Sequence, residues 1–422
     1  MNPLTLAQRD HACIWHPYTQ HGLQRGALAI ASAAGAYLKL SDGTEVLDGI
    51  SSWWVNLHGH GHRKIQEAIA QQVLVLDHVM FAGFTHEPAI LLAEKLLELS
   101  HAGGASSSRV FYSDNGSTAV EAALKIAFQY HVHAGKSARA KFLALKGSYH
   151  GDTLGAMAVS EPEGFHRLFR PLLAHVDFIE PDNFEELERC FSQGLSPYAA
   201  FIFEPLIQGA AGMRTYSSEF LKRAVELCQQ NSVLTIADEV FTGFYRTGSC
   251  FAFSQAQIDP DIVCLSKGLS GGVLPLAATL VNEEIFRAFY SSEMRKAFLH
   301  GHSYTANPIA CAAGLASLKL LEDSVVQKRL LGITAKTREM ISHLSSHPQV
   351  KSARALGTIG AVERKGSGDY FSASPDKLFR RALEKGVLLR PLGRVLYAVP
   401  PYCVTDKEIE KIYRVIGELL DE

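Results

Sequence analysis

The sequence has no long run of one charge sign and no apolar stretch long enough to cross a membrane. Its 41 basic and 43 acidic residues nearly balance, giving a formal net charge of −2. A nucleic-acid or membrane-surface protein needs a clustered basic face, so we expect neither kind of partner. The most apolar stretch, 27–38, is rich in Ala and Gly and far shorter than the roughly 20 residues that span a bilayer.

Cysteine is scarce, and a signal-like N-terminus is missing. The seven cysteines are scattered and form no Cys-x-x-Cys pair, which argues against both a disulfide framework and a zinc site. The first 19 residues lack the apolar core of a signal peptide and contain Asp10. We therefore expect reduced thiols in a cytoplasmic protein, with no metal site.

Short apolar runs alternate with helical sequence through the middle of the chain. Continuous apolar strands separated by helices indicate an α/β fold with a buried, mostly parallel sheet between helices. Several of the runs end in polar residues or in glycine. The runs are RVFYSD, KFLALKG, HVDFIE, AAFIFEP, VLTIADEV and DIVCLSKG.

The length of 422 residues predicts one large domain and one smaller domain. After residue 305 the pattern changes to mixed strands and helices, which predicts a smaller α+β domain. Residues 27–60 predict short strands joined by turns. We expect a segment at 1–60 that joins the small domain, a large domain at 61–305 and a C-terminal small domain at 306–422.

Helical periodicity is clear in several segments. Thr405 and Glu408 fit a capping box at the start of the last helix. Helices are predicted within 62–100, over 117–131 and 219–231, and from Pro308 onward.

In open α/β sheets, function collects at the carboxyl ends of the strands. After the run VFYSD, the residues Asn115-Gly116-Ser117-Thr118 precede a helical segment. Free backbone N–H groups, the helix dipole and two hydroxyls at a helix start can bind a phosphate. An ordinary helix N-cap explains the same residues, and taken alone it is the commoner case.

Two further strand ends carry charged residues. Asp238 and Glu239 end the run VLTIADEV, and a buried acid needs a partner, either a protonated pyridine nitrogen or Arg246 in a structural salt bridge. Lys267 ends the run DIVCL before a glycine-rich loop. Lysine is rarely buried without a reason, and its amine forms Schiff bases, although for this position taken alone a surface lysine is the safer interpretation.

A phosphate site, a partner for a pyridine nitrogen and a Schiff-base lysine, in this chain order, are far more specific together. The motifs that carry them resemble the class III aminotransferases, which are fold type I enzymes dependent on pyridoxal 5'-phosphate (PLP). These motifs are SDNGSTAVEAALKIA, SYHGDT, IADEVFTGFYRTG and LSKGLSGG.

A second set of motifs is more restrictive, and the pair Trp53-Trp54 is part of it. It resembles the branch of this family that moves an amino group from S-adenosylmethionine to 8-amino-7-oxononanoate, giving 7,8-diaminononanoate in biotin biosynthesis. The resemblance covers nearly the whole chain. The motifs are WHPYTQ, SSWWVNLHGHGH, HVMFAGFTHEPAI, FEPLIQGAAGMRTY, HGHSYTANPIACAA and LLRPLGRVLYAVPPY.

The resemblance implies a role for each cofactor residue. Lys267 would form the Schiff base with PLP and carry the proton, and Asp238 would keep the pyridine nitrogen protonated. Gly116 and Ser117 would bind the phosphate. Tyr149 would lie against the ring of the cofactor and face the substrate.

The resemblance also implies a substrate site and a shared dimer. Tyr18, Trp53, Trp54 and Arg390 would bind substrate, because aromatic walls suit adenine and an aliphatic chain and a guanidinium suits a carboxylate. The family's Gly-Pro-Thr segment, supplied by the partner subunit of a homodimer, matches residues 301–303. Here Gly301 would touch substrate and His302 and Ser303 the cofactor, and His302 departs from the family's proline.

Other residues stay open at this level. His58, His60 and His62 alternate, but the intervening glycines favour a turn over a metal site. Glu204 either lies near the cofactor or pairs with a buried base, and Asp152 is a candidate supporting group.

Three alternatives to this function remain. The chain could be another class III enzyme acting on an ω-amino acid, or could use lysine as donor. It could be a PLP-binding regulator, although no DNA-binding module is apparent. It could also be a phosphate-binding protein without chemistry.

Overall fold

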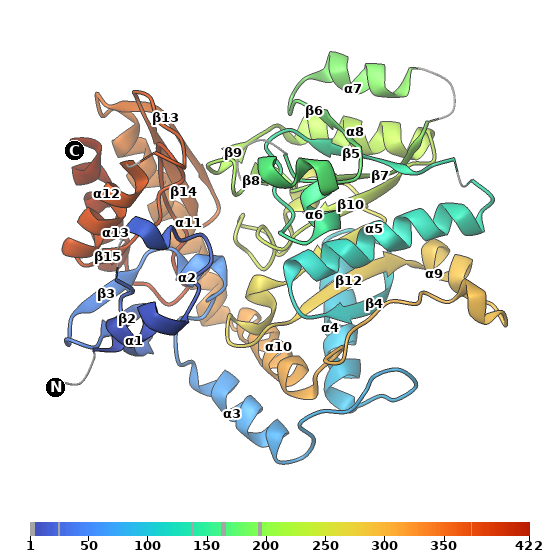
Figure 1. Ribbon diagram of the computed structural model, residues 1–422, viewed down its shortest axis with the longest axis horizontal. Coiled ribbons are helices and arrows are strands. Elements are labelled where there is room, and N and C mark those ends of the chain that lie inside the picture. The colour runs from blue at the N-terminus through green and yellow to red at the C-terminus, as the bar shows by residue number, and fades with distance from the viewer. Residues whose placement is uncertain (1–4, 24–25, 137, 162–165, 193–195, 373) are drawn as a thin grey trace.

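A seven-stranded sheet lies at the centre of the larger part of the computed structural model (Figure 1). The model describes residues 5–23, 26–136, 138–161, 166–192, 196–372 and 374–422. In spatial order the strands are β4 (Ser107–Ser113), β12 (Ala277–Asn282), β11 (Ile262–Leu265), β10 (Leu234–Asp238), β7 (Tyr198–Phe203), β5 (Lys141–Leu145) and β6 (Val176–Ile179).

The sheet is mostly parallel, which confirms the α/β prediction. Only β12 runs against its neighbours, β11 and β4. It was not among the predicted strands, although residues 277–282 are as apolar as the others. Its direction has a simple cause, since the connection 266–276 is too short for the helical crossover that two parallel strands need.

Both faces of this sheet are buried. Along β7, Ala200 and Ile202 belong to the cluster on the α5 side, whereas Phe201 and Phe203 pack on the opposite face. Strands covered on both sides read as continuous apolar runs, as these do. The helices of this part are α3 (Arg63–Val73), α4 (Glu87–Ala102), α5 (Gly116–His133), α6 (Leu154–Ala158), α7 (Phe184–Phe191), α8 (Ser218–Gln230), α9 (Glu283–Phe289) and α10 (Pro308–Leu321).

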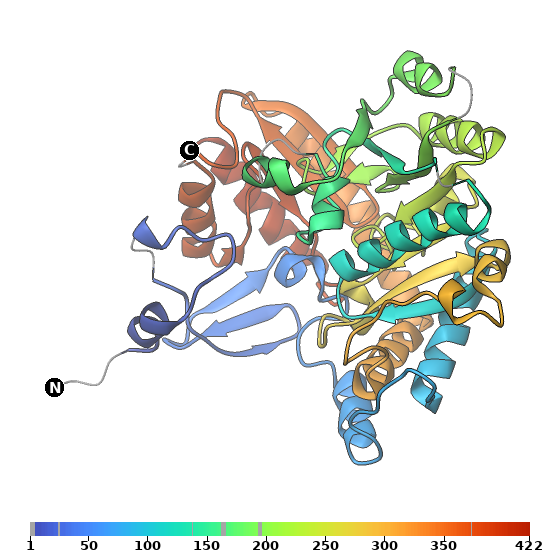
Figure 2. The ribbon, with the colours of Figure 1, turned by 45° about the vertical axis from the view of Figure 1, so that its right-hand side comes forward.

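The N-terminal strands and the C-terminal region of the chain lie side by side (Figures 1 and 2). The N-terminal strands β1 (Ile30–Ala34), β2 (Tyr37–Leu40) and β3 (Glu45–Asp48) continue into β15 (Val387–Leu388), which pairs in parallel with β3. A second sheet and three helices complete this region. They are β13 (Val350–Leu356), β14 (Ile359–Arg364), β16 (Val395–Ala398), α11 (Ser324–Ser345), α12 (Ser374–Glu384) and α13 (Asp406–Leu420).

The capping box of Thr405 and Glu408 is present at the start of α13, as predicted. The three-segment division of the chain stays a prediction. α10 was assigned to the small domain, yet it packs against α3 and α4 of the large part. The short elements are α1 (Leu6–Cys13), η1 (His21–Leu23), α2 (Ser51–Trp54), η2 (Arg167–Leu172), β8 (Ile207–Gln208), β9 (Arg214–Thr215), η3 (Ala252–Ala256), η4 (Lys267–Ser270) and η5 (Met294–Lys296).

Within the described residues, no helix combines the length and the apolar character that a bilayer crossing requires. All seven cysteines are free, and Cys228, Cys264 and Cys311 are buried.

Candidate active site

A cavity of about 510 Å³ opens where the strands of the large sheet end. Asp114 and Tyr149 follow β4 and β5, Glu204 follows β7, and Asp238 and Lys267 stand at the ends of β10 and β11. The fold therefore brings the three predicted strand-end motifs into one space. The cavity is lined by Trp54, Val55, Asp114, Asn115, Gly116, Ser117, Tyr149, His150, Gly151, Glu204, Gly209, Ala210, Asp238, Val240, Phe241, Ser266, Lys267, Gly272, Val273, Leu274, Pro275 and Leu276.

Lys267 presents its amine to aromatic rings. Its Nζ lies 4.9 Å from the ring centre of Trp54 and 5.7 Å from that of Phe241. Burial lowers the pKa of this lysine, although the carboxylates of Asp238 and Glu204 oppose the shift. A lowered pKa makes the unprotonated, nucleophilic amine more accessible. The backbone of Lys267 has a φ of 43°, which is uncommon outside glycine and typical of strained functional positions.

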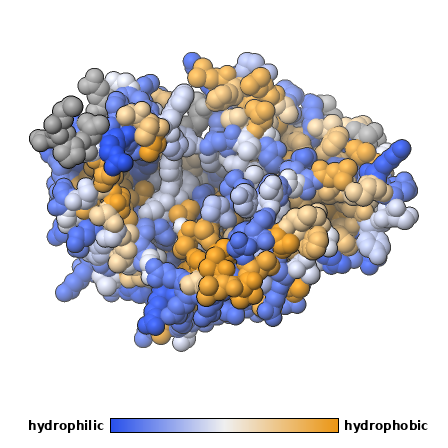
Figure 3. Space-filling view, turned by 60° about the horizontal axis from the view of Figure 1, so that its bottom comes forward, coloured by the Kyte–Doolittle hydropathy of each residue, from blue (hydrophilic) through white to orange (hydrophobic). Residues whose placement is uncertain are grey.

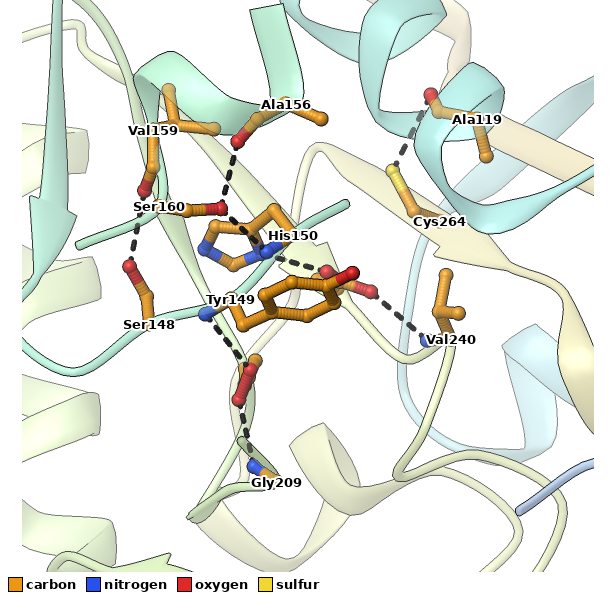
Figure 4. A network of polar contacts seen from close by, with 12 residues as sticks. Ala119, Ser148, Tyr149, His150, Ala156, Val159, Ser160, Gly209, Val240 and Cys264 are labelled. Atoms are coloured by element: carbon orange, nitrogen blue, oxygen red, sulfur yellow. Dashed lines mark hydrogen bonds and ion pairs between the residues drawn. The ribbon is translucent and has the colours of Figure 1, made fainter. Parts of the chain in front are cut away.

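Asp238 is held by two groups in the interior (Figure 4). Its Oδ2 lies 2.6 Å from Nδ1 of His150, and its Oδ1 accepts a 3.0 Å hydrogen bond from the backbone N–H of Val240. The backbone N–H of His150 in turn donates to Oγ of Ser160 at 2.8 Å. Asp238 is 4% exposed and still lines the cavity, so its carboxyl group meets the cavity in a region of low polarity.

The alternative of a structural salt bridge to Arg246 is wrong. Arg246 donates to the carbonyl of Pro400 at 2.7 Å, and its guanidinium lies 4.8 Å over the ring of Tyr402. Glu239, the second acid of the motif, accepts hydrogen bonds from the hydroxyl of Thr242 and the backbone N–H of Phe253. The two neighbouring acids therefore point into different environments, and only Asp238 reaches the cavity.

Glu204 is a second buried carboxyl group in the cavity wall. Its Oε1 accepts from the backbone N–H of Tyr149 at 3.3 Å, and its Oε2 accepts from that of Gly209 at 3.0 Å. Burial and the neighbouring Asp238 raise the pKa of Glu204 to about 8, against these two hydrogen bonds. Glu204 therefore lies beside the cavity and joins two loops, the one that carries Tyr149 and the one that carries Gly209.

The N-terminus of α5 faces the same cavity. Asn115 and Thr118 cap the helix reciprocally, and the cap does not use the N–H groups of Gly116 and Ser117, two residues that line the cavity. A Cβ atom on Gly116 would come within 2.7 Å of Val240, and one on Gly151 would collide with Ser117. The N-cap prediction is confirmed. The anion-site prediction stays a prediction, and the cap does not compete with it because it uses other N–H groups.

Tyr18, Trp53 and Arg390 form a second cluster. The guanidinium of Arg390 lies 4.8 Å over the ring of Trp53, and the rings of Tyr18 and Trp53 meet edge to face at 5.2 Å. Trp53 is 37% exposed, whereas Trp54 is 5% exposed and donates its Nε1–H to Tyr397. The cluster brings together two aromatic rings from the N-terminal segment and a cation from the C-terminal region.

The turn α2 aims the two tryptophans in different directions. Its four residues, 51–54, all have positive φ values, between 45° and 75°. The Oγ of Ser51 donates to the carbonyl of Val399, and Ser52 donates through both N and Oγ to Asp48. These hydrogen bonds hold a left-handed turn that costs free energy for L-residues.

Residues 301–303 lie outside the cavity of their own chain. Gly301 and Ser303 are exposed, and the nearest described acid to His302 is Asp114, with Nε2 and Oδ1 4.0 Å apart. The alternating histidines are engaged in other contacts. His58 lies 3.1 Å from Oγ of Ser317, and His60 pairs with Asp48 at 3.0 Å.

His150 was not predicted as a site residue. The sequence signal was available, because His150 directly follows Tyr149 in the Gly-Ser-Tyr-His-Gly segment after a buried strand. Its partner Asp238 lies 88 positions away, and only the fold brings the two together.

Comparisons with known proteins agree with this geometry. The model of the family "Aminotransferase class-III" matches residues 18–420. The chain is 46% identical to adenosylmethionine-8-amino-7-oxononanoate aminotransferase of Synechococcus elongatus, over 98% of this chain and 99% of that protein. It is 40% identical to the protein of the same name in Helicobacter pylori, over 99% and 98%.

Solved structures give the same picture. The adenosylmethionine-8-amino-7-oxononanoate aminotransferase of Methanocaldococcus jannaschii superimposes with a TM-score of 0.93 at 35% identity, covering 99% of this chain and 98% of that one. A PLP-bound amine transaminase from an uncultivated Pseudomonas species superimposes with a TM-score of 0.89 at 30% identity, covering 97% and 98%. The fold is the fold type I α/β fold that was predicted, and the chain belongs to the class III aminotransferase family.

Proposed function

We propose that this enzyme transfers an amino group from S-adenosylmethionine to 8-amino-7-oxononanoate and so forms 7,8-diaminononanoate for biotin biosynthesis. The observation that carries the proposal is that Lys267 lines one cavity with Asp238 and the N-terminus of α5. Relatives that share nearly the full length of the chain carry the name of this reaction.

Pyridoxal 5'-phosphate fits the residues of this cavity. A buried carboxylate at Asp238 suits a protonated pyridine nitrogen, and the N–H groups of Gly116 and Ser117 suit a phosphate. Lys267 supplies an amine for covalent attachment, and the ring of Tyr149 lines the space between. When bound, this cofactor supplies an electron-accepting ring for the cleavage of a substrate C–H bond.

The residues of the chain then have distinct tasks. The Nζ atom of Lys267 accepts the proton from the substrate carbon and later returns it. The lowered pKa of this lysine favours that role. The buried contact between His150 and Asp238 holds the carboxyl group of Asp238 in place at the end of the cavity. Trp54 and Phe241 keep water from the amine by covering it with apolar rings.

Arg390 and Trp53 suit the two unlike substrates. The aromatic faces of Trp53 and Tyr18 can stack adenine, attract a sulfonium and line an aliphatic chain. Arg390 offers a planar fork to the distal carboxylate of 8-amino-7-oxononanoate. Because the first product leaves before the second substrate enters, one site has to accept both substrates in turn.

We also propose a homodimer in which residues 301–303 complete the site of the partner subunit. Ser303 is exposed in its own chain and does not line the cavity there. Hydrophobic side chains gather on the side of the molecule where α3 and α4 lie (Figure 3), and large exposed apolar areas mark protein interfaces. They include Val73, Leu74, Val75, Met80 and Phe84. The scattered free thiols support a cytoplasmic location.

A coupled assay of amino transfer to 8-amino-7-oxononanoate tests this function. S-adenosylmethionine and lysine are compared as donors under the same conditions. Formation of 7,8-diaminononanoate with S-adenosylmethionine alone is the expected result. Transfer only from lysine would correct the donor, and transfer only to ω-keto acids unrelated to this acceptor would overturn the proposal.

A further inference from the structure

Asp152 is the centre of a hydrogen-bonded cluster at the mouth of the cavity. Its Oδ2 accepts from the hydroxyls of both Tyr18 and Tyr149, the latter at 2.9 Å, and these two hydroxyls lie 3.0 Å apart. Its Oδ1 lies 3.2 Å from Nε2 of His166. Burial alone would raise the pKa of Asp152, but the hydrogen bonds from His166 and the two tyrosines hold it below its usual range.

His166 contacts two members of this cluster at once. Besides its hydrogen bond to Asp152, its ring lies parallel to that of Tyr149, with ring centres 5.7 Å apart and planes at 21°. The imidazole is nearly fully buried, whereas about half of the side chain of Asp152 is exposed. The backbone carbonyl of His166 is itself held, since it accepts from the N–H of Phe169 at 2.9 Å.

The surroundings of the imidazole fix its hydrogen-bonding role. Nδ1 of His166 is buried and has no hydrogen-bond partner in the part of the chain that the structure describes. A proton on Nδ1 would therefore be left unsatisfied, so the neutral ring carries its proton on Nε2 and donates it to Asp152. A carboxylate that is half exposed gains a fixed orientation from this buried donor.

We propose that His166 is a positioning residue for amino transfer. It holds the plane of the Tyr149 ring by stacking and aims the carboxylate of Asp152 so that one oxygen receives both tyrosine hydroxyls. Tyr149 lines the cavity and Tyr18 contacts Trp53, so the cluster connects the cofactor end of the site to its substrate end. This inference rests on the proposed function, because amino transfer is the reaction it serves.

Three substitutions separate the two contacts. His166→Phe keeps a flat ring against Tyr149 and removes the donor to Asp152, His166→Asn keeps a donor and removes the stack, and His166→Ala removes both. We expect His166→Ala to slow single turnover by about 10- to 100-fold, because small misplacements of positioned groups cost that much. Added imidazole should restore part of the rate. His175→Ala, at an exposed histidine nearby, is the control and should match wild type.

A second readout does not depend on turnover. The visible circular dichroism of bound PLP reports the asymmetry of the groups around it, and it should change in His166→Ala and His166→Asn more than in His166→Phe. The loss caused by His166→Ala should be smaller in an Asp152→Ala background than in wild type, because only the stack on Tyr149 is then left to lose. Additive losses without rescue by imidazole would show a merely structural role and overturn the proposal.

The failure of this inference differs from the failure of the proposed function. If wild type does not aminate 8-amino-7-oxononanoate, the function is wrong, and the dichroism of the variants still decides the role of His166. If wild type is active while His166→Ala has normal rates and an unchanged dichroism band, only the His166 proposal is wrong. Should His166→Ala fail to fold, His166→Phe carries the same comparison, because its ring fills the same space.

Discussion

Nδ1 of His150 and Oδ2 of Asp238 lie 2.6 Å apart, and both side chains are buried. A carboxylate without a partner would be costly at this depth. His150 supplies a contact on one oxygen while the other oxygen stays close to the backbone of Val240. Among the described residues, Asp238 therefore keeps its place at the cavity through His150 and a backbone N–H, with no arginine or lysine in ion-pair contact.

Replacing Asp238 by asparagine should preserve the fold and slow the reaction. Asn has the same shape but no charge, so a bound pyridine nitrogen loses the group that keeps it protonated. We expect the half-reaction with S-adenosylmethionine to slow on the order of 100-fold, the size of a lost charge-assisted contact. Stopped-flow absorbance measures this rate. Glu239→Gln changes the adjacent acid, which points away from the cavity; equal rate losses in both variants would assign Asp238 a structural role.

Lys267→Ala should bind the cofactor through its phosphate without a covalent link. Both the attaching amine and the proton carrier are removed, so turnover should nearly vanish. Borohydride treatment followed by mass spectrometry should find cofactor fixed to wild type and to the exposed-site control Lys64→Ala, but none fixed to Lys267→Ala. Near-normal turnover in this variant would refute the assignment.

Arg390→Ala should separate the two substrates. Loss of a charge-assisted hydrogen bond weakens binding of 8-amino-7-oxononanoate by about 1.5–3 kcal/mol, with a smaller effect on S-adenosylmethionine. Trp53→Ala should impair both half-reactions, because it removes the stacking face and the support under Arg390. Single-turnover measurements of each half-reaction give the answer. Arg394→Ala, which changes the guanidinium paired with Glu363, is the control; equal losses in both half-reactions for Arg390→Ala would exclude a carboxylate clamp.

Mixing two inactive variants should recover activity if residues 301–303 act in the partner's site. A hybrid dimer of Lys267→Ala and Ser303→Ala chains contains one intact site, so random exchange should restore about a quarter of wild-type sites. Activity is measured after refolding the two chains together and separately. No gain on mixing, or a monomer by analytical sedimentation at assay concentration, would contradict the shared site.

Glu204 should make stability depend on pH. Its pKa is raised to about 8 in the folded protein, above the value near 4.3 of an exposed glutamate, so the folded state binds the extra proton between these values. Stability should therefore fall as the pH rises through this window. Melting temperatures of the apoprotein, measured at several pH values, should decline with rising pH in wild type and in the surface control Glu219→Gln. The decline should be weaker in Glu204→Gln. Parallel curves for all three would contradict the raised pKa.

Much of the fold and site could be predicted because strand ends in an α/β sheet converge. The runs before Asn115, Asp238 and Lys267 placed three motifs at one edge, and the cavity contains all three. The antiparallel β12 was not predicted, although residues 277–282 are as apolar as the predicted strands. Its direction follows from the short connection after β11. His150 was missed because its role depends on a pairing across distant sequence, which periodicity does not report.

The left-handed turn at Ser51–Trp54 limits how far this protein can be made heat-resistant without cost to its chemistry. Four L-residues with positive φ oppose folding by roughly 1–2 kcal/mol each, and glycine at such positions would relieve the strain. Replacing either tryptophan by glycine would remove a functional contact, because Trp54 covers Lys267 and Trp53 supports Arg390. Ser51 and Ser52 are tied to Val399 and Asp48 by their hydroxyls. Glycine substitutions that relieve this turn would therefore raise thermal tolerance at the expense of the substrate site.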